Sequence, residues 1–327
     1  MNKIVVTGAG GFLGRTLVTN LALDENNEVW ALDNNFRGSL NSITNQSNLM
    51  LKHCDVCDKK DISRLIKDSN IVFHLAAING TKNFYDIPDR VLEVGILGTH
   101  NVAKACIKYN VGQLVFASSS EVYQKPKHIP TTEEETCRVP EIANPRLSYG
   151  GSKITGELIV INYLRNSNTS FTILRPHNVY GPEMGFDHVI PELTRKTFQS
   201  SNGKRQTGKT VEIEIEGGGT ETRSFIYIDD AIDAIRLIVE KGEENSIFNI
   251  GTEEGKKITD IVDGIGKILG LRLKYRSSKL RKGSTPRRCP DTQKLRSLEF
   301  YPKTNFKKGL KKTVDWYWNY YLKSDIE

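Results

Sequence analysis

The stretch Thr7-Gly8-Ala9-Gly10-Gly11-Phe12-Leu13-Gly14 decides the fold, because it lies where an apolar run, Lys3–Thr7, gives way to helical periodicity over Phe12–Leu23. Glycines at 8, 11 and 14 permit a tight turn, close approach of the backbone to a pyrophosphate and close packing of the helix on the strand. The helix N-terminus that follows favours phosphate groups. The stretch therefore predicts a dinucleotide-binding turn.

Asp33 indicates which dinucleotide is bound. It ends the next strand-like run, Glu28–Asp33, 19 residues after Gly14. Its carboxylate can accept hydrogen bonds from both hydroxyls of the adenosine ribose and would repel a 2′-phosphate, which favours NAD over NADP. Arg37 points the other way, because a guanidinium four residues later could touch a phosphate or the adenine.

Short apolar runs alternate with helix-like stretches through the first 180 residues. This alternation is typical of βαβ units around a parallel sheet with ligands at the carboxyl ends of the strands. We predict an α/β fold, a Rossmann-like doubly wound sheet with a smaller C-terminal substrate-binding lobe. The predicted strands are Lys3–Thr7, Glu28–Asp33, Met50–Asp55, Asn70–Leu75, Gln113–Ser118 and Ser170–Arg175, and the predicted helices are Phe12–Leu23, Lys59–Lys67, Val91–Tyr109 and Tyr149–Arg165.

The pattern loosens after Arg175. We predict an NAD-binding domain over residues 1–176 and a smaller, mainly substrate-binding lobe over 177–327, with parts of about 226–250 returning to the first domain. Within the second region we expect an edge strand at Glu212–Glu216 and a further strand at Ser246–Ile250. We expect helices at Asp229–Lys241 and Thr259–Leu269, and a surface loop at Asn202–Lys209.

Composition excludes several classes of protein. The 327 residues are 38% hydrophobic and 26% charged, which is ordinary for a globular chain, and no apolar run approaches the ~20 residues that span a bilayer. We expect a cytoplasmic protein. Residues 256–327 carry 19 Lys and Arg against 7 Asp and Glu. We interpret this excess as a solvated basic face with some phosphate-binding groups rather than as a nucleic-acid or membrane surface, and the aromatic residues near the end as the apolar side of a terminal helix.

The five cysteines are expected to be free thiols. Cys54-Asp55-Val56-Cys57 is a single C-x-x-C without neighbouring histidines, so we predict no metal site there.

Tyr149 and Lys153 are the candidate catalytic pair. They lie four residues apart, hence on one face of the predicted helix. A tyrosine with an ordinary pKa near ~10 is a poor base, but a nearby ammonium and a cationic nicotinamide ring favour its phenolate. A serine of Ser118-Ser119-Ser120, at the end of a predicted strand, could hold a substrate oxygen while Tyr149 takes the proton and hydride passes to the cofactor. The alternative is a tyrosine that caps a core helix, with a solvated lysine.

These residues resemble the extended short-chain dehydrogenase/reductase family, specifically its nucleotide-sugar epimerases, dehydratases and decarboxylases. The resemblance covers nearly the whole chain and includes further motifs: Cys54-Asp55-Val56, His74-Leu75-Ala76-Ala77, Arg175-Pro176-His177-Asn178-Val179-Tyr180-Gly181-Pro182, Thr222-Arg223-Ser224-Phe225-Ile226-Tyr227-Ile228-Asp229 and an arginine before Pro290. It implies an NAD site made by Gly8, Gly11, Phe12, Leu13, Gly14, Asp33, Asn34, Arg37, Asp55, Val56, Leu75, Ala76, Ala77, Ser118, Tyr149, Lys153, Pro176 and His177.

For the substrate, the resemblance implies a nucleotide-diphosphate sugar (UDP-, GDP- or dTDP-linked) bound by Ser119, Ser120, Glu121, Tyr149, Asn178, Arg223 and Arg288. Asn178, Arg223 and Arg288 would hold the diphosphate, since guanidinium forks bind phosphate bidentately. The family commonly dimerises through two long helices, here Val91–Tyr109 and Tyr149–Arg165, so we expect a homodimer.

Two positions depart from the commonest family pattern. Gly95 stands where an asparagine is frequent, so hydrogen bonds of that asparagine are absent or replaced. His177 occupies a place often taken by an aromatic or small residue, and we favour a packed, neutral imidazole there over one that titrates near neutrality.

The reaction itself is left open at the motif Ser119-Ser120-Glu121-Val122-Tyr123. The shared step is transient C4 oxidation to a 4-keto-sugar by Ser119, Tyr149 and Lys153, as in an NAD-dependent epimerase/dehydratase. Glu121 makes the motif similar to UDP-glucuronate decarboxylases and GDP-mannose dehydratases, where it could act as a base at C5. It could instead pair with an arginine or cap a turn. A non-catalytic dinucleotide-sensing regulator on the same fold is the alternative of another class.

Overall fold

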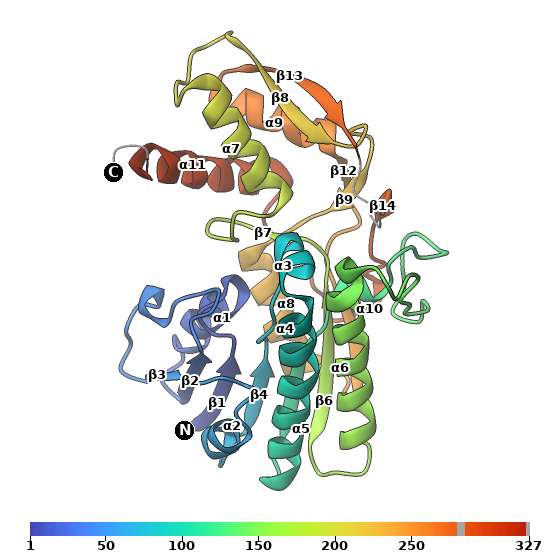
Figure 1. Ribbon diagram of the computed structural model, residues 1–327. Helices are drawn as coiled ribbons and strands as arrows, with labels where there is room; N and C mark the ends of the chain where they lie inside the picture. Colours follow the sequence, from blue (N-terminus) through green and yellow to red (C-terminus); the bar gives the residue numbers. More distant parts are fainter. Residues whose placement is uncertain (280–284, 325–327) are drawn as a thin grey trace.

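The computed structural model describes residues 1–279 and 285–324, and its main body is built on one parallel sheet (Figure 1). The strand order is β11-β6-β5-β4-β1-β2-β3, and every neighbouring pair is parallel. The predicted doubly wound α/β sheet is thereby confirmed. The strands are β1 (Asn2–Thr7), β2 (Asn27–Asp33), β3 (Leu49–His53), β4 (Ile71–His74), β5 (Gln113–Ala117), β6 (Ser170–Pro176) and β11 (Ser246–Ile250).

Helices cover both faces of the sheet, and β1 shows why. Its side chains alternate between two cores: Ile4 and Val6 pack in one cluster with Leu17, while Val5 packs in the other with Ile62. A strand buried on both sides reads as a continuous apolar run, which is the pattern the sequence shows here. One face carries α1 (Phe12–Leu21) and α8 (Ile228–Lys241), and the other carries α2 (Lys59–Ile66), α5 (Thr99–Lys108) and α6 (Ser148–Leu164).

The helix predicted over Val91–Tyr109 is present but not uniform. It consists of α4 (Pro88–Leu92), a π-helical stretch η2 (Glu93–Gly98) and α5. Gly95 lies in the π-helical stretch, and a Cβ added there would come 2.6 Å from Ser152 Oγ on α6. The close contact between these two helices therefore explains why an asparagine does not occupy this position.

A smaller lobe lies above the carboxyl ends of the strands (Figure 1). It contains α7 (Val189–Ser201), β8 (Thr210–Glu216), α9 (Ile258–Leu269), β13 (Arg272–Ser278) and α11 (Phe306–Ser324), with β13 parallel to β8. The strand expected at Glu212–Glu216 and the helices expected at Asp229–Lys241 and Thr259–Leu269 are all present. The sequence did not predict α7 or β13.

Short strands connect the lobe to the main body. They are β7 (Val179–Tyr180), β9 (Thr222–Ser224), β10 (Ile226–Tyr227), β12 (Gly255–Lys257) and β14 (Arg287–Arg288). Because β10 pairs with β7 and leads into α8, the chain re-enters the main body before β11 completes the large sheet.

The remaining general expectations concern cysteines, aromatics and membranes. All five cysteines are free thiols, and burial raises the pKa of Cys54 and of Cys57 to about 12, so both hold their protons. Tyr317 and Trp318 are buried on α11, as expected for the apolar side of a terminal helix. Within residues 1–279 and 285–324, no helix combines the length and apolarity needed to cross a membrane.

Candidate active site

A cavity of about 810 Å³ lies between the carboxyl ends of the strands and the smaller lobe. Its size suits a cofactor and a small substrate together. Every residue predicted from the sequence to bind cofactor or substrate lines this cavity except Asp55 and His177. Residues that lie up to 280 positions apart in the chain therefore meet at one place, the carboxyl edge of the sheet, where ligands bind in open α/β folds.

The glycine turn forms one end of the cavity. Gly8 has a φ of +72°, and a Cβ on Gly14 would lie 2.1 Å from the Gly8 carbonyl oxygen, so both positions require glycine. The Gly10 amide donates a hydrogen bond to Asp33 Oδ2 at 2.9 Å. Since α1 begins at Phe12, its N-terminus also faces this end of the cavity, which suits a pyrophosphate.

Asp55 lies behind the cavity wall and acts through a neighbour. Its carboxylate accepts hydrogen bonds from Asn34 Nδ2 at 3.0 Å and from the Cys57 amide at 2.8 Å. Burial opposes ionisation of Asp55, but these hydrogen bonds outweigh it and lower the pKa of the carboxyl group. Asp55 thus fixes the Asn34 side chain, which does line the cavity.

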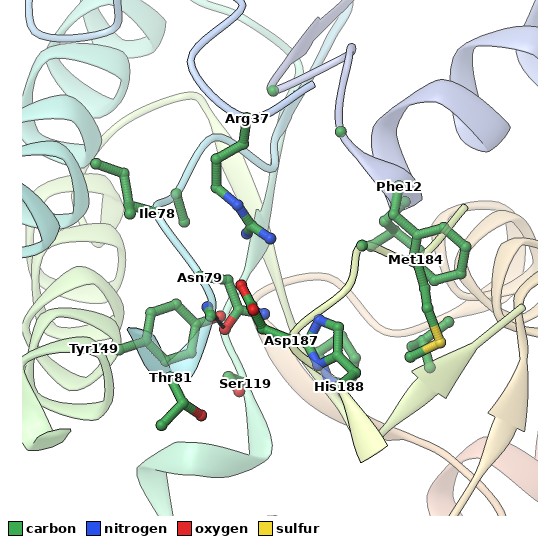
Figure 2. A pocket seen from close by; sticks show the side chains of 18 of the residues that line it. Phe12, Arg37, Ile78, Asn79, Thr81, Ser119, Tyr149, Met184, Asp187 and His188 are labelled. Atoms are coloured by element: carbon green, nitrogen blue, oxygen red, sulfur yellow. Dashed lines mark hydrogen bonds between the residues drawn. The ribbon is translucent and has the colours of Figure 1, made fainter. Parts of the chain in front are cut away.

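Arg37 reaches much further into the cavity than its place in the sequence indicates. Figure 2 shows its guanidinium aimed toward Asp187, across from Tyr149. Its Nη2 lies 4.0 Å from the point that a Cβ on Gly80 would occupy and 3.7 Å from the corresponding point on Gly185. Burial lowers the pKa of Arg37, while Tyr149 and Asp187 oppose that shift. The guanidinium therefore lies in the part of the cavity that holds Tyr149 and Asp187.

Ser119, Tyr149 and Lys153 come together as predicted. Tyr149 lies in the first turn of α6 and points into the cavity, where Ser119 also lies (Figure 2). The Tyr149 ring stacks on Phe84, with centroids 5.1 Å apart. One turn along α6, Lys153 Nζ donates to the Ala117 carbonyl at 2.6 Å and lies 5.7 Å from the centre of the Tyr149 ring.

The electrostatics of this pair depend on burial. Burial raises the pKa of Tyr149 to about 12, although the nearby Ser119 hydroxyl acts in the opposite direction. Burial lowers the pKa of Lys153 to about 7, with Glu157 opposing the shift. A phenolate at neutral pH therefore needs further positive charge beside Tyr149.

Glu121 is held by arginines. Its carboxylate forms two hydrogen bonds with Arg288, at 2.5 and 2.9 Å, and Arg146 Nη2 lies 4.0 Å away. Burial would raise the pKa of Glu121, but Arg288, then Arg146 and Arg223, outweigh it and lower the pKa to about 2. The sequence left open whether this carboxylate is a base or an arginine partner, and in the structure it pairs with Arg288.

The predicted diphosphate-binding residues lie around this pair. Asn178, with a φ of +42°, donates from Nδ2 to the Ser224 carbonyl at 2.9 Å. Burial, with Arg288 nearby, lowers the pKa of Arg223 to about 10. Arg146, Arg223 and Arg288 thus bring three guanidiniums together, with Glu121 and Glu221 as the neighbouring acidic groups. The excess of positive charge suits an anion.

His177 is packed behind the cavity. Its Nε2 lies 3.3 Å from Asn249 Oδ1, its ring faces Tyr123, and burial lowers its pKa to about 3. The expected neutral, packed imidazole is confirmed. The ring is turned away from the cavity, so any cofactor contact at this position would involve the backbone.

The sequence missed two loops that complete the cavity wall. The loop after β4 contributes Ile78 and Asn79, followed by Thr81 at the start of α3 (Thr81–Asp86), and the loop before α7 contributes Met184, Asp187 and His188 (Figure 2).

The second of these loops is fixed by α11. Tyr317 Oη donates to the Gly185 carbonyl at 2.5 Å, and the Phe186 ring meets Tyr317 edge-on at 5.7 Å. Burial lowers the pKa of His188 to about 4, so a neutral imidazole faces the cavity. No sequence motif marked this loop, and only its position after a strand end could have indicated it.

Comparison with known proteins identifies the family. Residues 4–251 match the family described as "NAD dependent epimerase/dehydratase family". The chain belongs to this family. It is accordingly an NAD-dependent enzyme of the nucleotide-sugar epimerase/dehydratase class, of the short-chain dehydrogenase/reductase type.

Relatives of this epimerase/dehydratase cover nearly its full length. It is 32% identical over 319 residues to a protein named putative UDP-glucose 4-epimerase from Methanocaldococcus jannaschii, covering 96% of this chain and 97% of the relative. It is 28% identical to the UDP-N-acetyl-alpha-D-glucosaminuronate decarboxylase of Bacillus cytotoxicus, with 96% and 97% covered. The crystal structure of UDP-glucuronic acid 4-epimerase from Bacillus cereus, in complex with UDP-glucuronic acid and NAD, superposes with a TM-score of 0.86 at 27% identity, covering 98% and 100%.

The residues present fit NAD. Gly14 packs so closely on Gly8 that a Cβ would not fit, which keeps the turn tight; the N-terminus of α1 faces the cavity, and Asp33 lines it at the end of β2, where a ribose would be recognised. Tyr149 and Lys153 line the opposite part of the same cavity, so a bound dinucleotide would extend from the glycine turn to the catalytic pair.

Proposed function

We propose that this enzyme is a nucleotide-diphosphate-sugar 4-epimerase that oxidises C4 of the sugar transiently and reduces it again on the other face. The convergence of Ser119 and Tyr149 in one cavity carries the proposal, because it places an acceptor and a proton-transfer group where one carbinol hydroxyl can contact both. NAD, when bound, supplies the chemistry of accepting the C4 hydride and returning it.

Tyr149 is the proton-transfer group. It takes the proton of the C4 hydroxyl as C4 becomes a ketone, and it gives the proton back when C4 is reduced. Ser119 orients the same oxygen. Because the pKa of Tyr149 is raised to about 12 by burial, its phenolate requires the ammonium of Lys153 and the positive charge of the oxidised cofactor nearby.

The arginine cluster supports a diphosphate ligand. Arg223 and Arg288 would each donate to phosphate oxygens, and Arg146 adds a third cation to the same part of the cavity. The relatives reported above are all named for UDP-sugars, so we propose a UDP-linked hexose as the substrate class. Asn178 would add an amide donor beside the cluster.

The state of Glu121 favours epimerisation over reactions that need a base at C5. A carboxylate with a pKa near 2 and both oxygens bonded to Arg288 is a weak base. A 4,6-dehydratase also needs an acid, and the neighbouring position is Ser120 rather than a carboxylic acid. A 4-epimerase needs neither, since the keto-sugar only has to turn over within the cavity.

The proposal is tested by incubating the NAD-loaded protein with UDP-glucose, UDP-galactose, UDP-glucuronate and the matching GDP- and dTDP-sugars. Products are followed by mass and chromatography. We expect a product of unchanged mass and altered retention from a UDP-hexose. Loss of water would indicate a dehydratase, loss of carbon dioxide a decarboxylase using Glu121, and binding without turnover a sensor, and each of these would overturn the proposal.

The variant Tyr149→Phe tests the assigned base. We expect turnover to fall about a hundredfold or more, because general acid–base catalysis contributes that much, while NAD still binds. Tyr163→Phe is the matched control, since Tyr163 lies on the exposed side of the same helix and its loss should leave turnover unchanged.

A further inference from the structure

A buried charge pair lies directly beneath the catalytic residues and takes no part in the proposed chemistry. Glu157, one helical turn after Lys153 on α6, faces Arg175 on β6 and Ser118 at the end of β5. Their exposed fractions are 5%, 3% and 4%. All three are thus shielded from solvent.

The contacts of this pair are short and bidentate. Arg175 donates from Nε to Glu157 Oε1 at 2.9 Å and from Nη2 to Oε2 at 2.6 Å, while Ser118 Oγ donates to Oε1 at 2.5 Å. A backbone hydrogen bond links the same two segments, because the Ser118 amide donates to the Leu174 carbonyl of β6 at 2.8 Å. One carboxylate therefore ties together the ends of two strands and a helix.

These contacts adjoin the catalytic groups in the chain. Ser118 is followed by Ser119, and it is preceded by Ala117, whose carbonyl accepts the hydrogen bond from Lys153. A displacement of Ser118 would hence move both the hydroxyl that faces Tyr149 and the acceptor that holds the ammonium.

The opposite side of Arg175 is also satisfied. Its Nη1 donates to Tyr123 Oη and to the Glu133 carbonyl, both at 2.8 Å, and Tyr123 Oη donates in turn to Asn249 Oδ1 at 2.8 Å. A buried ion pair is often no more stabilising than a well-packed apolar pair of the same size. Stability alone therefore gives no reason for this arrangement.

Lys153 receives few other charges. On its own helix, Lys153 faces Tyr149 and Glu157. The neighbouring residue from β4 is His74, which is neutral because burial lowers its pKa to about 3. From β5, Lys153 contacts the Ala117 carbonyl and the ring of Phe116, neither of which is charged. Among the described residues of β6, the charged side chain on this side is Arg175, and it is paired with Glu157. Across the cavity Arg37 and Glu121 act on Tyr149. Glu157 is thus the acidic group that counters the burial of the ammonium.

We propose that Glu157 and Arg175 are positioning residues for catalysis: a buried ion pair that locks the strand end carrying Ser119, with the Glu157 carboxylate also balancing the charge of Lys153. The inference rests on the proposed function, in which the Lys153 ammonium supports proton transfer by Tyr149. Neither member of the pair touches substrate or cofactor.

The test measures the protonation of Lys153 directly. The NAD-loaded protein is labelled at lysine Cε, the Lys153 signal is assigned by its loss in Lys153→Arg, and its chemical shift is followed against pH. In Glu157→Gln, which leaves Arg175 charged, we expect the midpoint to move to lower pH by about one unit or more. In the double variant Glu157→Gln/Arg175→Met, which is neutral again, we expect the midpoint to lie between those of Glu157→Gln and the wild type.

A stability control separates this role from a structural one. Asp230 is a comparably buried carboxylate, at 2% exposure, which accepts hydrogen bonds from the Lys303 and Thr304 amides away from the cavity. Asp230→Asn should lower the melting temperature and leave the Lys153 titration unchanged.

An unchanged Lys153 midpoint in Glu157→Gln would overturn the inference. If that variant does not fold, the double variant decides, and a wild-type midpoint in it overturns the inference. Full turnover in Tyr149→Phe would instead refute the proposed function and leave the titration result standing, so the two failures are distinguishable.

Discussion

Replacing Glu121 by glutamine distinguishes the two roles that the sequence left open for this residue. The substitution keeps the shape of the side chain and removes its charge. If Glu121 is a partner of Arg288, the variant loses stability and keeps its chemistry. If Glu121 is a base at C5, the variant loses its chemistry.

The expected loss of stability follows from the pKa. Burial would raise the pKa of Glu121, but Arg288 outweighs it and lowers the pKa from 4.5 to about 2, a change worth about 3 kcal/mol at about 1.4 kcal/mol per tenfold. Because the folded-state pKa is depressed, this stabilisation is fully present above the unfolded value near 4.5 and disappears as the pH falls toward about 2. At pH ~7 we expect the free energy of unfolding of Glu121→Gln to be about 2 to 3 kcal/mol below that of the wild type. At pH ~3 we expect this gap between variant and wild type to be smaller by about 2 kcal/mol.

Two measurements check this expectation. Urea unfolding of the wild type and Glu121→Gln, at neutral and at acid pH, gives the difference in free energy of unfolding. Calorimetry with UDP gives the second result: binding should tighten, because the variant removes one negative charge from the arginine cluster that would hold a diphosphate. Turnover of the UDP-hexose should stay within about tenfold of the wild type, since C4 oxidation needs no base at this position.

Glu135→Gln serves as the matched control. Its carboxylate has 4% side-chain exposure and pairs with Arg138 at 3.2 Å, but it does not line the cavity. It should change stability without changing UDP binding. The reasoning about Glu121 is wrong if Glu121→Gln unfolds like the wild type at neutral pH while turnover falls a hundredfold.

Two further expectations concern the glycine turn and the oligomeric state. Gly14→Ala should weaken NAD binding at least tenfold in calorimetry, because its Cβ would lie 2.1 Å from the Gly8 carbonyl oxygen. The control Gly151→Ala should leave NAD binding unchanged, because its Cβ would come no nearer than 3.7 Å to Val139. We also propose a homodimer that buries Leu158, which is 57% exposed on α6, so Leu158→Glu should sediment as a monomer and the α11 control Leu322→Glu as a dimer.

The main sheet could be predicted because its strands are buried on both faces. Val5 and Val6 of β1 and Val72 and Phe73 of β4 are all at most 1% exposed, so each strand appears in the sequence as a short apolar run. The glycine turn and the Tyr149–Lys153 pair could be predicted equally well, since each is defined by the spacing of a few neighbouring residues. Features that depend on the spacing of neighbouring residues could therefore be predicted from the sequence.

The smaller lobe could be predicted only in part, for the converse reason. The strand β8 alternates exposed and buried residues, so Thr210–Glu216 carries a clear signal, but its partner β13 is exposed along nearly its whole length and carries none. The loop with Asp187 and His188 takes its position from Tyr317, about 130 residues away in the chain. A contact of that separation leaves no periodicity or motif near the loop.

Arg37 shows how the fold resolves a question that spacing leaves open. Four residues after Asp33, a guanidinium could have received the 2′-phosphate of NADP. The loop between them instead crosses the glycine turn: the Ser39 amide donates to the Gly10 carbonyl, and a Cβ on Gly38 would come 1.9 Å from that same oxygen. This crossing sends Arg37 toward Tyr149 and Asp187 (Figure 2). The ion pairs of the described residues include none between Arg37 and Asp33. The Asp33 carboxylate therefore lines the cavity, held by the Gly10 and Asn35 amides and without a neutralising guanidinium, which is the arrangement that favours NAD.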